Sequence, residues 1–351
     1  MTVLTIVGAR PQFIKAAAVS RVLRRTHREV LIHTGQHYDA GLSDVFFQEL
    51  DLPEPDEHLE VGSGTHAEQT GRMLVGVEAA IEHHRPEIVL VYGDTNSTLA
   101  GALAAAKLDV PIAHIEAGVR SFKRRMPEEV NRIVTDRLSH LLFCPSDTAV
   151  SNLRMEGITT GVHLVGDVMA DVFRLTTANG HRASPLVRAL GLEPGGYLLA
   201  TIHRAENTDQ SGRLSALMDS LGGTTEPVVF PVHPRTRKTL EAERIPVPSN
   251  VKIIDPVGYA DMLTLAGSAR LILTDSGGLQ KEAYWLGVPC VTLRDETEWV
   301  ETVDAGWNRL VSADPSRIRD ALAVVGRPPT HPRLYGDGHA AERIVEILDG
   351  R

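Results

Sequence analysis

Short apolar runs alternate with longer segments of helical periodicity along almost the whole chain. In the first half the apolar runs are residues 2–8, 28–35, 87–93, 111–118, 140–146 and 162–168. Helix-like segments separate them, among them residues 11–25, 95–108 and 127–140. Strands that alternate with helices are typical of βαβ units, in which the strands run parallel. The first half therefore predicts a parallel sheet covered by helices.

The second half repeats this alternation. Its strand candidates are residues 196–203, 227–233, 250–255, 270–276 and 289–295, with helical segments such as 260–269 and 277–287 among them. The stretch 176–185 lacks periodicity and is rich in Gly, Pro and polar residues, so we expect a boundary near it. The last segment, 340–350, has the apolar spacing of an amphipathic helix. A length of 351 residues also suits two domains, and ligand sites prefer the cleft between domains.

The composition argues against nucleic-acid and membrane partners and indicates a cellular compartment. The net charge of −9 argues against non-specific nucleic-acid binding, so an anionic ligand needs a local group of cations or helix N-termini. The longest uncharged run, residues 95–106, is too short to span a membrane, and the N-terminus resembles a strand more than a signal peptide. The only two cysteines, Cys144 and Cys290, indicate no disulfide framework and favour a reduced, cytoplasmic setting.

Three acidic residues stand where a doubly wound fold would place a reaction centre. Asp94 and Glu116 each end an apolar run, and Glu128 opens a helix-like segment. Because ligands bind outside the carboxyl ends of parallel strands, Asp94 and Glu116 are expected to share one crevice. Clustered carboxylates can transfer protons, since repulsion and burial push their pKa values apart. The alternative is that these acids cap helices or form structural ion pairs.

Two strand-to-helix turns are candidate phosphate sites. The first comprises residues 8–11. Such a turn presents free backbone N–H groups to an anion, and Arg10 and Lys15 add positive charge. An ordinary tight turn would have the same sequence pattern. This turn is not the GxGxxG fingerprint of dinucleotide binding, so no NAD cofactor is expected.

The second candidate, Ser276-Gly277-Gly278, opens a helix after an apolar run. Its glycines let a ligand approach the backbone at the positive end of the helix dipole, which suits a diphosphate. Glu282 lies one turn further and is a candidate acceptor for ribose hydroxyl groups.

His203 and His233 each end a strand beside an arginine, so their side chains are expected to enter one crevice and to neutralise or protonate a diphosphate leaving group. Arg294 follows another strand and is a candidate contact for phosphate or base. No metal site is expected, because no set of His, Asp and Glu has a familiar ligand spacing.

These motifs together resemble the non-hydrolysing UDP-N-acetylglucosamine 2-epimerase family. The matching pieces span nearly the whole chain in the family's order: GARPQFIKAA, TGQHYD, VYGDTNSTLAGALAA, HIEAGVRSF, MPEEVNR, GDVMAD, HRAENTD, HPRT, IDP, LTDSGGLQKEA, GVPCVTLRDETEW and YGDG. The resemblance implies the glycosyltransferase-B architecture, in which two Rossmann-like domains face a cleft and the terminal helix crosses back to the first domain. On this basis the first domain comprises residues 1–168 with a terminal helix at about 337–351, and the second comprises 169–336. A cytoplasmic homodimer is also implied.

The resemblance implies a mechanism as well. UDP leaves C1 by anti elimination with loss of the C2 proton, and it adds back to the 2-acetamidoglucal after C2 is protonated from the opposite face. Asp94, Glu116 and Glu128 match the family's acids, and His203 matches its catalytic histidine. The family's UDP-binding positions carry over onto Arg10, His233, Ser276, Gly277, Gly278 and Glu282, and Lys15 and Arg294 look similar in role.

One segment departs from the pattern. Members regulated by a second substrate molecule tend to have an arginine and further polar residues where this chain has Tyr-Asp-Ala-Gly at 38–41. This difference argues against allosteric activation. The segment 38–41 resembles instead a branch of the family that includes archaeal enzymes and 2-epimerases of UDP-2,3-diacetamido-glucuronic acid. The basic run Lys123-Arg124-Arg125 could bind a sugar carboxylate, but a solvated loop would show the same charges.

Other classes remain as alternatives. A UDP-sugar glycosyltransferase would share the fold and the UDP site, but it needs an acceptor pocket and not three acids around C2. A hydrolysing epimerase often carries a kinase domain, for which this chain has no room. A non-catalytic sensor would be expected to lose one of the acids, and all three are present.

Overall fold

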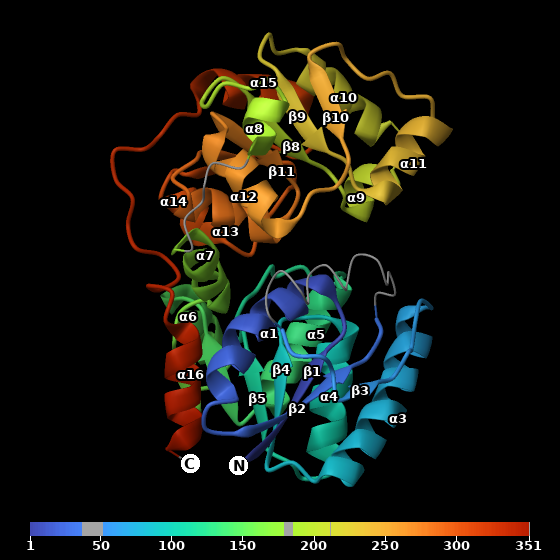
Figure 1. Cartoon of the computed structure of the whole chain (residues 1–351), viewed down its shortest axis with the longest axis vertical. Coiled ribbons are helices and arrows are strands. Elements are labelled where there is room, and N and C mark those ends of the chain that lie inside the picture. Colours follow the sequence, from blue (N-terminus) through green and yellow to red (C-terminus); the bar gives the residue numbers. More distant parts are fainter. Residues whose placement is uncertain (37–51, 179–184, 211, 351) are drawn as a thin grey trace. The chain divides into compact units, whose positions relative to one another are not determined.

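The chain folds into two compact units, each built on one parallel sheet (Figure 1). The computed structural model describes all residues except 37–51, 179–184, 211 and 351, and the side chain of Arg10. The first unit comprises Met1–Thr177 and Tyr335–Arg351, and the second comprises Ala178–Leu334. The first unit thus includes residues 169–177, which the sequence places in the second domain. The segment 38–41 lies outside the described residues.

The first sheet has seven strands in the order β3-β2-β1-β4-β5-β6-β7, all paired in parallel. The strands are β1 (Thr2–Val7), β2 (Arg28–His33), β3 (Glu57–His58), β4 (Ile88–Tyr92), β5 (Ile112–Ile115), β6 (Leu141–Cys144) and β7 (Val162–Leu164). The order reverses between β1 and β4, which is the point where open α/β sheets bind ligands. The turns that follow β1 and β4 flank this point, and the turn after β5 lies next to the turn after β4.

Helices cover the first sheet. They are α1 (Arg10–Leu23), α3 (His66–His84), α4 (Asn96–Lys107), α5 (Pro127–Leu138), α6 (Asp147–Met155), α7 (Val168–Ala178) and α16 (Ala340–Asp349). The apolar face of α16 packs on α1, where Ile344 and Leu348 join the same buried core as Val19 and Leu23. Asp171 of α7 accepts hydrogen bonds from the first N–H groups of α16. The terminal helix therefore returns to the first unit, as expected.

The second sheet has six parallel strands in the order β10-β9-β8-β11-β12-β13. The strands are β8 (Leu198–Thr201), β9 (Val228–Pro231), β10 (Val251–Ile254), β11 (Leu271–Thr274), β12 (Cys290–Thr292) and β13 (Asn308–Leu310). The helices are α8 (Pro185–Ala189), α9 (Ala205–Thr208), α10 (Arg213–Gly222), α11 (Pro234–Ala242), α12 (Tyr259–Ser268), α13 (Gly277–Trp285), α14 (Val300–Asp304) and α15 (Pro315–Val324). Here the order reverses between β8 and β11, so the turns after these strands occupy the second unit's ligand position.

The predicted α/β fold with two Rossmann-like domains is confirmed, and every predicted strand is present. Two strands at sheet edges, β3 and β13, were not predicted, because their residues, Glu57–His58 and Asn308–Leu310, are mostly polar and form no apolar run. None of the helices in the described part combines the length and the apolar character that crossing a bilayer requires.

Candidate active site

Lys15 of α1 and Glu116, in the turn after β5, meet beside the turn after β4. The Gly93 N–H donates to the carbonyl of Ile115 at 2.9 Å, so the two turns are adjacent. Lys15 Nζ lies 2.7 Å from Glu116 Oε2, and both side chains are only 9% exposed. A Cβ at Gly93 would lie 3.3 Å from Lys15 Nζ and 3.6 Å from Glu116 Oε1, and Gly93 also has a positive φ of 63°. The glycine therefore lets the ion pair approach the backbone.

Glu116 has an unusual backbone conformation that a buried network supports. Its φ is +72°, a region that a non-glycine residue adopts at a cost of about 1–3 kcal/mol. Buried Asp136 holds the flanking residues: it bonds His114 Nδ1 and Arg120 Nη1 at 2.7 Å each and accepts the Gly118 N–H at 3.1 Å. Burial alone would raise the pKa of Asp136, but hydrogen bonds and charge from His114 and Arg120 hold it below its ordinary value. Asp136 thus stays ionised and fixes the turn that carries Glu116.

Asp94 is fixed by α5, the helix that also carries Glu128. Arg132 forms a close ion pair with the Asp94 carboxylate, and Asn131 Nδ2 donates to the Asp94 carbonyl at 2.9 Å. The other arm of Arg132 pairs with Glu129 at 2.9 Å. Glu128, in the first turn of α5, is exposed, and no side chain in the described part of the chain pairs with it. Asp94 is therefore held, whereas Glu128 presents its carboxylate to solvent.

The turn after β1 differs from its prediction as an open anion site. The N–H groups of Gly8 and Ala9 both donate to Gln12 Oε1, at 2.9 and 3.1 Å. Buried Gln12 in turn donates to the Tyr92 carbonyl at 2.9 Å and so ties this turn to the end of β4. The prediction that these two N–H groups are free was therefore wrong. Arg10 begins α1, but its side chain lies outside the described part of the structure.

In the second unit, the His203 side chain pairs with the buried carboxylate of Asp275. His203 Nδ1 lies 3.0 Å from Asp275 Oδ1, and Asp275 also accepts hydrogen bonds from the His203 and Arg204 N–H groups and from Asn207. Burial would raise the pKa of Asp275, but the His203 imidazole and the other donors hold it below its ordinary value. The His203 side chain is 42% exposed. An ionised aspartate therefore orients an imidazole whose other nitrogen remains available to a ligand.

His233 lies beside His203, as the paired strand ends predict. The two ring centroids are 6.3 Å apart. His233 caps α11, where its Nδ1 accepts the Arg235 N–H at 3.2 Å. The structure thus brings the two predicted histidines together at one edge of the second sheet.

Ser276 is the N-cap of α13, and Gly277 and Gly278 are its first residues. A Cβ at Gly277 would approach Trp299 Nε1 to 3.2 Å, whereas one at Gly278 would meet only Ser276 Oγ at 3.9 Å. The first N–H groups of a helix lack partners within the helix and bind anions. Glu282 is buried in the next turn. The geometry at the end of β11 is thus suited to a diphosphate.

Arg294 is buried, although its position after a strand suggests a cation that is exposed to a ligand. It is 1% exposed, and its two terminal nitrogens each bind a Glu298 oxygen at 3.0 Å. Glu296 lies 3.8 Å away. A phosphate or base contact by Arg294 would require this buried pair to open, so its predicted role in binding stays a prediction.

Sequence reasoning missed several residues that hold the candidate site in place. They are Gln12, Arg132, Asp136 and Asp275. The sequence could have indicated Asp275, because this residue ends an apolar run as Asp94 does. Asp136 and Arg132 lie inside a helical segment, where a surface charge would give the same pattern. Only the fold identifies their partners.

Comparison with known proteins gives a consistent result. Residues 21–349 match the family model described as UDP-N-acetylglucosamine 2-epimerase. A UDP-2,3-diacetamido-2,3-dideoxy-D-glucuronate 2-epimerase of Pseudomonas aeruginosa is 50% identical over 99% of each chain. A UDP-N-acetylglucosamine 2-epimerase of Methanococcus maripaludis is 44% identical over 98% of this chain and 97% of its own. The crystal structure of the Methanocaldococcus jannaschii UDP-GlcNAc 2-epimerase, in complex with UDP-GlcNAc and UDP, superposes with a TM-score of 0.92 at 41% identity and covers 100% of both chains.

Proposed function

Because the chain belongs to the UDP-N-acetylglucosamine 2-epimerase family, we propose that it interconverts UDP-N-acetylglucosamine and UDP-N-acetylmannosamine. The observation that carries the proposal is the pair of acids on neighbouring strand ends, each fixed by a cation: Glu116 by Lys15 and Asp94 by Arg132. Fixed carboxylates are suited to removing and returning a proton.

The chemistry requires two proton transfers at C2. A carboxylate removes the C2 proton while the C1–O bond to UDP breaks, and the electron pair of the C2–H bond forms the double bond of 2-acetamidoglucal. A second acid then protonates C2 on the opposite face, and a UDP oxygen bonds to C1 again. Asp94, Glu116 and Glu128 are the proposed donors and acceptors, and no redox cofactor is needed because no net oxidation occurs.

The second unit supplies the groups for UDP. The C2 proton is only weakly acidic, so the C1–O bond must weaken as the diphosphate gains negative charge. The N-terminus of α13, at Ser276 to Gly278, offers N–H groups to that charge, and His203 is positioned by Asp275 to donate a proton or hydrogen bond. We assign His233 to a UDP contact because it lies beside His203, and Glu282 because it lies in α13, one turn after the proposed diphosphate site.

The test is proton NMR of the purified protein with UDP-N-acetylglucosamine in D₂O. The expected result is UDP-N-acetylmannosamine with deuterium at C2, because the returned proton comes from solvent through a carboxylate. A folded, UDP-binding protein that exchanges no C2 hydrogen would contradict this substrate. Transfer of the sugar to an acceptor with C2 hydrogen retained would indicate a glycosyltransferase instead.

A second substrate is favoured by a specific observation. The Pseudomonas aeruginosa relative at 50% identity is named for UDP-2,3-diacetamido-2,3-dideoxy-D-glucuronate, whose sugar carries a carboxylate. Arg124 and Arg125 are exposed just before α5, close in sequence to Glu128. If this sugar is the substrate, the same NMR experiment should show C2 exchange with the diacetamido compound and none with UDP-N-acetylglucosamine.

Replacing Arg10 by alanine is expected to weaken UDP binding by roughly 10- to 100-fold. The substitution deletes a proposed charge-assisted hydrogen bond worth about 1.5–3 kcal/mol. Calorimetric titration with UDP measures the change, and Arg21→Ala, on the exposed side of the same helix, is the control. An unchanged dissociation constant for Arg10→Ala would remove this residue from the UDP site.

We also propose that the protein is a cytoplasmic homodimer. The support is the family resemblance together with the reduced setting that two buried, unpaired cysteines suggest. Light scattering of the purified chain should give twice the monomer mass of 38.2 kDa, and a monomer mass would contradict the proposal.

A further inference from the structure

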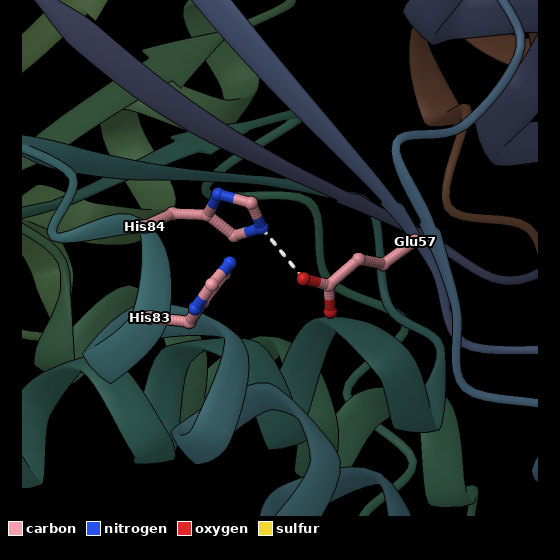
Figure 2. Close-up of side chains that lie close together, drawn as sticks. All are labelled: Glu57, His83 and His84. Carbon is pink, nitrogen blue, oxygen red and sulfur yellow. Dashed lines mark hydrogen bonds and ion pairs between the residues drawn. The ribbon is translucent and has the colours of Figure 1, made fainter.

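We propose that Glu57, His83 and His84 form a binding site for a divalent transition ion of the zinc class. Each residue offers one ligand atom, and these atoms lie within 4.8 Å of one another. Figure 2 shows the two imidazole rings and the carboxylate gathered around one small space. Within the described ranges, this is the one cluster of three such side chains with that spacing.

The three ligands come from two anchored elements. Glu57 begins β3, where it pairs in register with Ile32 of β2, and His83 and His84 end α3. His84 Nε2 lies 2.6 Å from Glu57 Oε1, so the two elements already meet at this point. The C-terminal end of a helix carries partial negative charge, which favours a bound cation. The backbone thus places the donor atoms close together without help from an ion.

The donor set decides the class of ion. Two imidazole nitrogens and one carboxylate oxygen suit Zn²⁺ and related ions, whereas Ca²⁺ and Mg²⁺ prefer oxygen ligands alone. Around a tetrahedral ion with bonds of about 2.0–2.2 Å, ligand atoms lie roughly 3.3 Å apart. The widest pair of ligand atoms, within 4.8 Å, therefore needs to close by at most about 1.5 Å, and the His84–Glu57 pair, at 2.6 Å, needs to open by about 0.7 Å. The His84 and Glu57 side chains are 15% and 33% exposed, so water can complete the coordination.

The site is separate from the proposed catalytic residues. Helix α3 leads into the amino end of β4, whereas Asp94 follows the carboxyl end of the same strand. An ion here would join the short edge strand β3 to α3 and stabilise the first unit without touching substrate. A sequence separation of 27 residues between Glu57 and His84 explains why spacing motifs predicted no metal site.

The experiment uses the full chain without an affinity tag, freed of metal with EDTA and dialysed. Calorimetric titration with Zn²⁺ is expected to show one ion per chain, and Co²⁺ should give the visible absorption of a tetrahedral site. At a free Zn²⁺ concentration of about 100 times the dissociation constant, the thermal midpoint of the first unit should rise by roughly 5–10 °C. Ca²⁺ should cause no shift.

Variants connect binding to these residues. His83→Gln is the decisive one, because His83 is exposed and a metal-free variant should keep the wild-type thermal midpoint. It is expected to lose at least about tenfold in Zn²⁺ affinity, as is Glu57→Gln. The matched controls are His66→Gln, at the other end of α3, and Glu82→Gln, an exposed acid beside the cluster; both should bind Zn²⁺ as the wild type does.

Two results would overturn the proposal. The first is the absence of stoichiometric Zn²⁺ binding by the wild-type chain. The second is equal Zn²⁺ affinity in wild type, His83→Gln and Glu57→Gln, which would place the ion on other histidines. Neither result bears on the epimerase proposal, whose residues are different.

Discussion

Replacing Glu116 by glutamine is expected to lower kcat by about 10²- to 10⁴-fold while leaving UDP affinity nearly unchanged. Glutamine keeps the shape of the side chain, but its amide can neither accept nor deliver the C2 proton. UDP affinity persists because most of the proposed UDP contacts lie in the second unit. Steady-state rates and a calorimetric titration with UDP measure the two quantities separately.

The same substitution leaves Lys15 without its anionic partner. Both side chains are only 9% exposed, and removal of one member of a buried ion pair typically costs about 3–5 kcal/mol. The double variant Lys15→Met/Glu116→Gln removes both charges and should recover much of the lost thermal stability without recovering turnover. Near-normal turnover in Glu116→Gln would exclude Glu116 from the mechanism.

Replacing Asp275 by asparagine is expected to lower kcat by roughly 10²-fold or more. Asp275 supplies the charge that orients the His203 imidazole, and its four donors leave no good place for an amide NH₂ group. Rates of the two single variants and of the double variant with His203→Asn measure the coupling. If Asp275 acts through His203, the double variant should be little slower than His203→Asn alone.

Asp255→Asn is the matched control for this prediction. Asp255 follows β10 as Asp275 follows β11, but its side chain is 90% exposed and pairs with Arg237 at the surface. Exposed pairs contribute only about 0–1 kcal/mol, so stability and turnover should stay near wild type. A wild-type kcat for Asp275→Asn would show that His203 needs no aspartate for the reaction.

The free energy of unfolding is also expected to depend on pH through the ionisation of Asp275. Its pKa in the folded protein lies below the ordinary value, so its contribution to stability is present above the pKa of the unfolded chain. That contribution is lost as the pH falls through the lower folded value. The stability advantage of wild type over Asp275→Asn is therefore expected to be full at neutral pH and to shrink in acid. Urea unfolding at several pH values measures it, and a constant difference would contradict this account.

Much of the fold follows from local pattern. An apolar run of four to seven residues ends where a buried strand ends, so the pattern alone places Asp94, Glu116, His203 and Ser276 at strand ends. Lys15 shows the limit of that reasoning. Its sequence position suggests a phosphate contact, but the structure pairs it with Glu116, about one hundred positions away.

The sequence by itself determined the alternation of strands and helices, the family and the candidate acids. These depend on the periodicity of burial and on motifs of neighbouring residues, which the chain carries locally. The tertiary structure alone decided which charges meet. Asp136 could be a surface acid or the support of the Glu116 turn, and Arg294 could be a phosphate contact or a buried partner of Glu298. The same holds for Glu57 beside His84, since contact between distant residues depends on how strands and helices pack and not on their spacing in sequence.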